Sequence, residues 1–155
     1  AARFFFNMTS ATNSMDFDLG LAIEESSKNP VYYVQYAHAR ICSIFRKLKE
    51  EGVSVKAAKT VDDLVHLGSD EEKELIRHIA AFTGEIVAAA DTRDPAKITR
   101  YAIELATLFH KFYNSCRVIC EDEAVMAARL ALCDATRITL KNALTLLKIT
   151  VPESM

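Results

Sequence analysis

The stretch NPVYYVQYAHARICSI, residues 29 to 44, decides the fold because it joins a helix start to two different side-chain stripes. Asn29 is a favourable N-cap, and Pro30 suits the first helical turn. The spacing predicts a long helix that ends near Gly52. Apolar residues recur along it at helical intervals and predict a face turned to the core. They are Val34, Ala37, Ile41, Ile44, Phe45 and Leu48.

A second stripe borders the apolar face of this helix. On a helix that turns about 100° per residue, Tyr33, Tyr36 and Arg40 fall within about 60° of one another. Aromatic rings and a guanidinium at such a border either pack half-buried or form a surface for a ligand. Tyrosines at the margin of a bundle commonly bury the ring and leave the hydroxyl in water, so the pattern alone favours packing.

The rest of the chain also has helical patterns. Further helices are expected at about 18–27, 60–67, 69–87, 94–119 and 122–147. Ser69 with Glu72 forms a capping-box pattern, and Asp94-Pro95 repeats the cap-then-proline signal. The aromatic run of residues 4–6 suits a strand or a buried helix end, whereas the polar stretch after it suits a loop. No strand pair is predicted after residue 30, so we expect an all-α helical bundle with short loops.

Composition limits the classes of protein to consider. A chain of 155 residues suits one domain, or one domain and a fragment of another. The net charge of −2 provides no general cationic field, so nucleic-acid binding would depend on a local patch. No apolar run approaches the roughly 20 residues of a membrane span, and no secretion signal opens the sequence. We expect a cytoplasmic protein with no membrane partner.

Motifs for catalysis and metal binding are absent or weak. The sequence has no phosphate-binding glycine loop and no hydrolase or metalloprotease motif. His38 and Cys42 have the spacing of an activated thiol, but no third residue orients them, which favours packing. Cys116 and Cys120 are also four apart and could share a metal, yet no second ligand pair has suitable spacing. We therefore expect no catalytic residue and no metal site in this chain.

The helix expected from Asp94 carries a stripe like the first. His110, Tyr113 and Arg117 are spaced i, i+3 and i+7, so two such helices could face each other across one groove. Unpaired bases suit this groove, because bases stack on tyrosine and arginine can stack or hold a phosphate. The alternative is a helical protein–protein interaction module in which the groove holds a partner helix.

Four segments resemble one known family. They are DFDLGLAIEESSKNPVYYVQYAHARICSI, FHKFYNSCRVI, AARLALCDATR and LLKITVPESM. The first closely resembles bacterial arginyl-tRNA synthetases at the junction of the catalytic core and the C-terminal domain, and the others resemble the rest of that domain. The signature of the domain, Asp-Ala-Leu-Arg, is present as Asp134, Ala135, Thr136 and Arg137. The resemblance covers essentially the whole chain.

The resemblance implies a fold and a function. Residues 1–28 would be the end of the catalytic core, and residues 29–155 a DALR anticodon-binding domain, the bundle found in class Ia synthetases. The domain would bind the anticodon stem-loop of an arginine tRNA, while the full-length parent ligates arginine to that tRNA with ATP and Mg²⁺. The parent's ATP-handling motifs are absent here, so the chain alone is expected to be inactive and without a cofactor. The implied partners are tRNA and the catalytic domain of the same chain, not DNA.

The expected site has seven residues from two sources. Five match anticodon-facing positions of the family: Tyr33, Tyr36, Arg40, Tyr113 and Met155. Two, His110 and Arg117, come from the stripe spacing alone.

The chain departs from the family pattern at three positions. Thr136 replaces a leucine, and its hydroxyl can bond back to a helix carbonyl with a small effect on stability. Lys148 stands where a glycine is usual, at the turn that aims the terminal tail. Ser154 replaces a common arginine, which removes one phosphate contact.

Overall fold

The computed structural model describes residues 1–155 except 11–12, 54–57 and 59. The described residues contain no β-strand, which confirms the all-α expectation. The helices are α1 (Ala2–Met8), α2 (Leu19–Ile23), α3 (Pro30–Glu50), α4 (Asp70–Ala80), α5 (Phe82–Thr92), α6 (Ala96–Ser115) and α7 (Glu123–Leu146), with a short 3₁₀ turn η1 (Asp62–Leu64).

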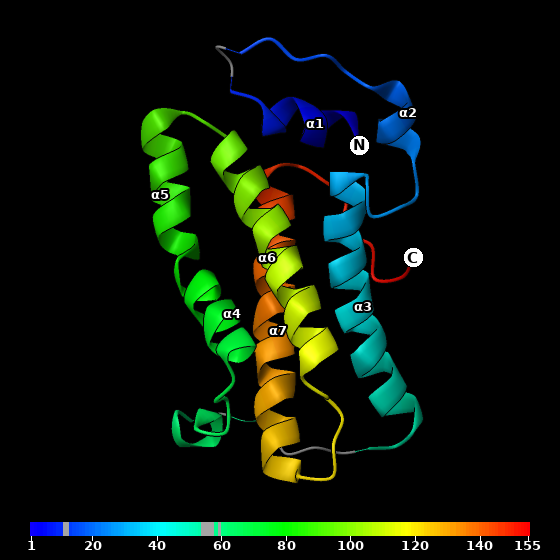
Figure 1. Ribbon diagram of the computed structural model, residues 1–155, viewed down its shortest axis with the longest axis vertical. Helices are drawn as coiled ribbons and strands as arrows, with labels where there is room; N and C mark the ends of the chain where they lie inside the picture. The colour runs from blue at the N-terminus through cyan, green and yellow to red at the C-terminus, as the bar shows by residue number, and fades with distance from the viewer. Residues whose placement is uncertain (11–12, 54–57, 59) are drawn as a thin grey trace.

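The long helices form a bundle around α6, in which α3 runs parallel to α6 and α4, α5 and α7 run antiparallel to it (Figure 1). Helix α6 packs against α3, α4, α5 and α7 along its length, and against α1 as well. Its central side chains, Leu105, Phe109 and Phe112, are fully buried. Burial of large apolar side chains at this density is the main term that stabilises such a bundle.

Helix α3 begins as the sequence predicts. The Asn29 side-chain oxygen accepts a hydrogen bond from the backbone of Val31 at 3.2 Å, and Pro30 occupies the first helical position. The Asn29 amide also donates to the carbonyls of Ala22 at 3.3 Å and Glu24 at 2.9 Å. These two bonds explain why α2 ends at Ile23 instead of continuing to residue 27. The Asn29 amide occupies carbonyls at the end of α2.

The N-terminal aromatic run forms helix α1, which lies across the end of the bundle where α3 begins (Figure 1). Phe4 and Phe5 are buried, whereas Phe6 is 61% exposed and stacks on Phe17 with ring centroids 5.4 Å apart. The Thr99 hydroxyl on α6 donates to the carbonyl of Asn7 at 3.0 Å. The first residues are therefore part of the same packed unit as α6.

The single helix expected at 69–87 is wrong, because the chain breaks at Ala81 into α4 and α5. The Ser69–Glu72 capping box is present at the start, as predicted. At the break, the carbonyl of His78 accepts from the Tyr101 hydroxyl at 2.8 Å and from the backbone of Ala81 at 3.2 Å. A tertiary partner thus occupies a carbonyl that would otherwise extend the helical ladder.

Two other boundaries differ from expectation, whereas the start of α7 agrees with it. The segment expected at 60–67 has only the 3₁₀ turn η1, where Asp63 accepts from the Thr60 hydroxyl and backbone, both at 2.9 Å. Helix α6 stops at Ser115 instead of residue 119. Helix α7 begins after Asp122 as predicted, and the buried Thr136 hydroxyl donates to the Leu132 carbonyl at 2.8 Å.

Lys148 forms the C-terminal turn of α7 with a left-handed backbone, φ 57°. The Ile149 amide donates to the Leu144 carbonyl at 2.9 Å, the closing bond of a Schellman turn. A side chain at this conformation costs about 1–2 kcal/mol, part of which glycine returns through the entropy of the unfolded chain. We expect Lys148→Gly to raise the free energy of unfolding by about 0.5–1 kcal/mol, measured by urea denaturation.

Lys141→Gly is the matched control, because Lys141 is an exposed lysine within α7. There the same substitution should lower stability by about 1 kcal/mol. Equal destabilisation by both substitutions would show that the turn at residue 148 does not need a left-handed residue.

Candidate nucleic-acid interface

The aromatic stripes of α3 and α6 meet in the structure. The ring of His110 lies 4.9 Å from the ring of Tyr33 and 5.9 Å from the ring of Tyr36. The expectation that these two helices face each other through their stripes is therefore confirmed.

Arg40 lies between tyrosines of the two helices. Its guanidinium carbon is 4.4 Å from the ring centroid of Tyr113 and 5.6 Å from that of Tyr36. Phe109 supports the Tyr113 ring from the core side, with centroids 5.9 Å apart. Among the described residues Arg40 has no ion pair or side-chain hydrogen bond, so two rings hold the guanidinium and no carboxylate neutralises it.

Two adjoining pockets share Tyr36 and Arg40, and we refer to them together as the α3–α6 groove. The first has a volume of about 270 Å³ and is lined by Ser27, Tyr32, Tyr33, Tyr36, Arg40, His110 and Asn114. The second has a volume of about 350 Å³, and its lining includes Tyr36, Arg40, Arg46, Lys47, Tyr113, Ser154 and Met155. Six of the seven expected site residues thus lie on one continuous surface.

Arg117 is the exception, because the helical spacing that predicted it as a site residue does not extend to its position. Because α6 ends at Ser115, Arg117 lies in the following loop and is not one helical turn beyond Tyr113. Its backbone carbonyl accepts from Arg129 at 2.9 Å, which fixes the loop to α7. The exposed side chain lines a neighbouring pocket of about 490 Å³, which also touches Tyr113. Arg117 lies beside the groove, outside its two pockets.

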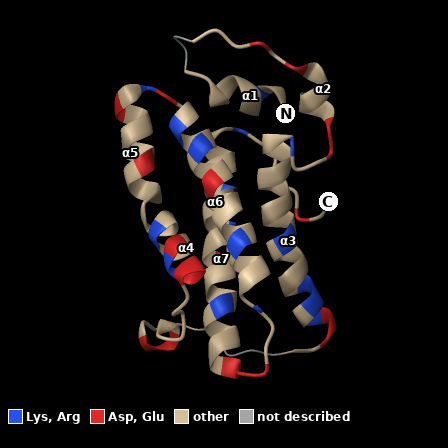
Figure 2. Ribbon diagram, viewed as in Figure 1, with Lys and Arg blue, Asp and Glu red and all other residues tan. Residues whose placement is uncertain are grey.

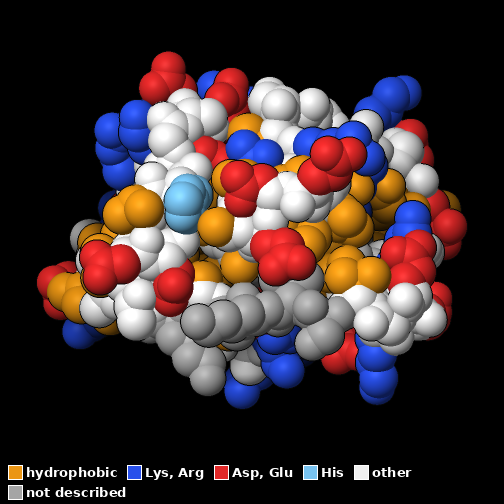
Figure 3. Space-filling model, turned by 90° about the horizontal axis from the view of Figure 1, so that it is seen from below, with side chains coloured by type: hydrophobic (Ala, Val, Ile, Leu, Met, Phe, Trp, Pro, Cys, Tyr) orange, Lys and Arg blue, Asp and Glu red, His pale blue; other side chains and the backbone are white. Residues whose placement is uncertain are grey.

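Positive charge gathers along one wall of the second pocket. Arg40, Arg46 and Lys47 follow one another along α3, and Figure 2 shows blue, basic positions along the lower half of this helix. Lys47 has only an exposed pair with Glu51 at 3.7 Å, which is weak in water. The end of the molecule seen in Figure 3 instead mixes acidic, basic and apolar side chains. The groove therefore combines aromatic faces with local positive charge on a chain of nearly neutral net charge.

His110 contributes a neutral ring to the groove. Burial, reinforced by the positive charge of Arg40, lowers the pKa of His110 to about 4. Its Nε2 atom is buried without a hydrogen-bond partner among the described residues. A neutral imidazole avoids a second cation beside Arg40, so His110 acts here as a packing surface between two tyrosines.

His38 and Cys42 pack as expected and do not form an activated pair. His38 is buried, and burial lowers the pKa of its imidazole. Burial raises the pKa of the Cys42 thiol, which opposes formation of a thiolate. Cys116 and Cys120 bind other partners, the Ser69 hydroxyl at 3.4 Å and the Asp122 carbonyl at 3.5 Å. Within the described ranges no three ionisable side chains gather as metal ligands.

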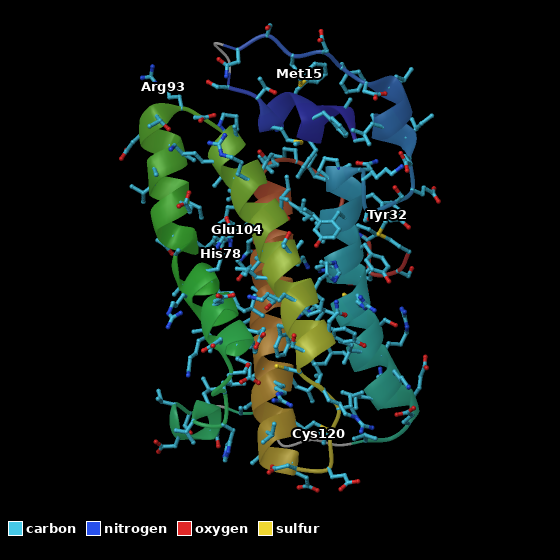
Figure 4. The ribbon with its side chains drawn as sticks, in the orientation of Figure 1. Met15, Tyr32, His78, Arg93, Glu104 and Cys120 are labelled. Atoms are coloured by element: carbon cyan, nitrogen blue, oxygen red, sulfur yellow. The ribbon has the colours of Figure 1, made fainter. Side chains whose placement is uncertain are left out.

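The sequence reading missed Tyr32. Its ring stacks on Tyr36 with centroids 6.4 Å apart and an interplanar angle of 6°, and it projects from the first turn of α3 (Figure 4). The spacing of Tyr32 and Tyr36 is i, i+4, which was available as a signal. The reading also missed Asn114, which lines the first pocket beside His110.

An all-α bundle with an aromatic and basic groove between two of its helices defines the class of helical binding modules. The family model of the DALR anticodon binding domain matches residues 34–155. This chain therefore belongs to that family. No described helix is both long and apolar enough to cross a membrane.

Curated relatives agree with this assignment. The chain is 54% identical over 155 residues to an arginine–tRNA ligase of Symbiobacterium thermophilum and 54% identical to one of Caldanaerobacter subterraneus. It spans 28% and 27% of their lengths, so it corresponds to about a quarter of such a protein.

Solved structures show the same fold. Arginyl-tRNA synthetase of Thermus thermophilus superposes with a TM-score of 0.82 at 28% identity, over 99% of this chain and 26% of that one. The Plasmodium falciparum synthetase superposes with a TM-score of 0.80 at 26% identity, again over 99% of this chain and 26% of that one.

Proposed function

We propose that the chain recognises the anticodon stem-loop of an arginine tRNA, and that the α3–α6 groove is the recognition site. The observation that carries the proposal is the unit of Arg40 held between Tyr36 and Tyr113 at the junction of two pockets. Family membership and the names of the relatives indicate which RNA. Sequence-specific RNA recognition commonly targets unpaired loop bases, which require faces for stacking and donors for phosphates or base edges.

Each part of the groove has a role in this proposal. Tyr36 is 37% exposed and stacked on Tyr32, so the ordered pair of rings is partly open for a base to contact. The guanidinium of Arg40 retains its donors for a phosphate or a base edge, because no carboxylate occupies them. Arg46 and Lys47 extend the positive charge along the path of the phosphate backbone. Tyr33 and His110 form the floor of the first pocket.

The activity of a longer parent is part of the same proposal. The relatives are named arginine–tRNA ligases. We place the ligation of arginine to tRNA, with ATP and Mg²⁺, in a catalytic region outside this chain. We assign residues 1–28 to the end of that region and residues 29–155 to the anticodon-binding domain. Exposed Phe6, Leu19 and Ile23 on α1 and α2 support contact with a further part of the protein. We place this activity in the cytoplasm.

Filter binding of the chain to an arginine tRNA and to an unrelated tRNA, at low and moderate salt, tests the proposal. We expect tighter binding of the arginine tRNA, with an affinity that falls linearly on a log–log plot against salt. A groove for a partner helix would instead give no preference between the RNAs. Equal binding of both tRNAs at both salt concentrations would overturn the proposal.

A further inference from the structure

The segment after α7 returns along α3 and is attached to it at two points. The Gln35 amide donates to the carbonyl of Thr150 at 2.8 Å and to its hydroxyl at 3.1 Å. The ring atom Nδ1 of His38 lies 2.9 Å from the carbonyl of Pro152. Because a carbonyl only accepts, Nδ1 must carry the proton and donate to Pro152.

These bonds join elements that are far apart in the sequence. Gln35 and His38 are three residues apart and lie on the same face of α3. They bind alternate carbonyls of the tail, those of Thr150 and Pro152. The side chains of Ile149, before Thr150, and of Val151, between Thr150 and Pro152, pack against the core. The tail therefore has a fixed register: apolar side chains contact the core, and the intervening carbonyls contact α3. Figure 1 shows the end of the chain beside α3.

His38 is suited to hold the tail. Its side chain is 1% exposed, so its hydrogen bond is formed without competition from water. Burial lowers the pKa of His38, which keeps the ring neutral with one donor. The other ring nitrogen, Nε2, has no partner in the described part of the chain. Nδ1 also lies 3.7 Å from the sulfur of Cys42, but its short contact, at 2.9 Å, is with the tail.

The attached segment ends in the α3–α6 groove. Ser154 and Met155 line its second pocket together with Tyr36, Arg40 and Tyr113. Met155 is 52% exposed, so burial of its own side chain fixes it only in part. The position of this wall of the pocket must then depend on the attachments further back, at Thr150 and Pro152.

We propose that Gln35 and His38 are positioning residues that hold the tail on α3, and that this attachment places Ser154 and Met155 as a wall of the RNA-binding groove. Neither residue lines the groove itself. The expected effect on RNA affinity rests on the proposed function. The attachment of the tail to α3 does not, because it is a property of the free chain.

The test uses near-isosteric variants. Gln35→Met keeps the length of the side chain and removes its donors without adding charge. At His38, asparagine places an amide nitrogen near the position of Nδ1, whereas glutamine places one near Nε2. We therefore expect His38→Asn to keep the tail attached and His38→Gln to release it.

The first readout is the position of the tail in the free chain, from NMR of methyl-labelled methionine. The four methionines of the parent chain give few signals, and Met155 is assigned with a chain lacking residues 153–155. Gln35→Met adds a fifth methyl signal, which is identified by its absence from the spectra of the parent chain and of His38→Gln. In Gln35→Met and His38→Gln the Met155 methyl signal should move to the position of an unfolded peptide, while the Met126 signal stays in place. An unmoved Met155 signal in both variants would overturn the attachment.

The second readout is affinity for arginine tRNA. Loss of one such hydrogen bond should weaken binding about two- to tenfold in Gln35→Met and His38→Gln, with little change in His38→Asn. In the chain lacking residues 153–155, Gln35→Met should have no further effect, because the wall is already gone. An additional loss there would show that Gln35 acts independently of the tail and overturn the positioning role. If the parent chain binds no tRNA, the proposed function fails, while the methyl signal still decides the attachment.

Discussion

Arg40→Ala is expected to weaken binding of an arginine tRNA by about ten- to hundredfold at moderate salt. The guanidinium holds Tyr113 and Tyr36 on either side of it, so its loss removes a stacking surface, a bidentate donor and the order of two rings. Stacking alone contributes about 1–3 kcal/mol per base, and each 1.4 kcal/mol is about tenfold in affinity. Filter binding with the chain provides the measurement.

Two further variants separate the contributions of Arg40. Arg40→Lys keeps the charge but loses the planar fork and its stacking, so its affinity should lie between those of the parent chain and Arg40→Ala. Arg100→Ala is the matched control, since Arg100 is an exposed arginine on α6 with only a surface pair to Asp94 at 3.6 Å. It should change affinity by less than about twofold. If Arg40→Ala and Arg100→Ala weaken binding equally, the groove is not the RNA site.

The sequence predicts the parts of this site that depend on helical periodicity. The cap at Asn29 and the border positions of Tyr33, Tyr36 and Arg40 follow from local rules, and they have the expected places. Helices α3 and α6 pack together through the two stripes of similar composition. Periodicity therefore predicts what lies on one helix face, whereas the pairing of the two faces is established by the ring contacts of the structure.

Tertiary contacts determine the features that the sequence does not predict. The break at Ala81 follows from the Tyr101 hydroxyl bonding the His78 carbonyl, a contact with no local signal. Arg117 lies in the loop after α6 and not on the helical stripe, and Arg129, 12 positions later, binds its carbonyl. The attachment of the tail by Gln35 and His38 likewise joins segments more than a hundred residues apart. Such partners are specified by packing of the whole bundle and not by spacing along one helix.

A buried ion pair connects the start of α4 to α7 and to the loop beside the groove. The Glu72 carboxylate, whose side chain is 1% exposed, accepts from Arg129 Nε at 2.7 Å and from the Ser69 backbone at 2.9 Å. Arg129 also donates to the Arg117 carbonyl. One network thus satisfies a helix cap, a buried carboxylate and the turn that follows α6.

Glu72→Gln should lower the free energy of unfolding by about 3–5 kcal/mol, the cost of removing one charge from a buried pair. The amide nitrogen of glutamine accepts no hydrogen bond, so the donor that faces it, either Arg129 or the Ser69 backbone, loses its partner. Urea denaturation followed by circular dichroism at neutral pH measures the change. Glu74→Gln is the matched control on the same helix, because Glu74 pairs with Lys111 at 2.8 Å with both side chains about half exposed, 43% and 51%. That change should cost much less than Glu72→Gln, because water screens an exposed pair.

The pH dependence provides a second, independent check on Glu72. Burial by itself raises the pKa of the Glu72 carboxyl, but the hydrogen bonds from Arg129 and Ser69 and the charge of Arg129 outweigh it and leave the pKa below its ordinary value. The folded state therefore binds this proton less readily than the unfolded state, whose pKa is about 4.3. The stabilisation is present above that pH and is lost as the pH falls through the folded pKa. The difference in free energy of unfolding between the parent chain and Glu72→Gln should accordingly shrink below about pH 4. A difference that is constant with pH, or equal to that of Glu74→Gln, would contradict this expectation. It would mean that packing around residue 72, and not its charge, holds these elements together.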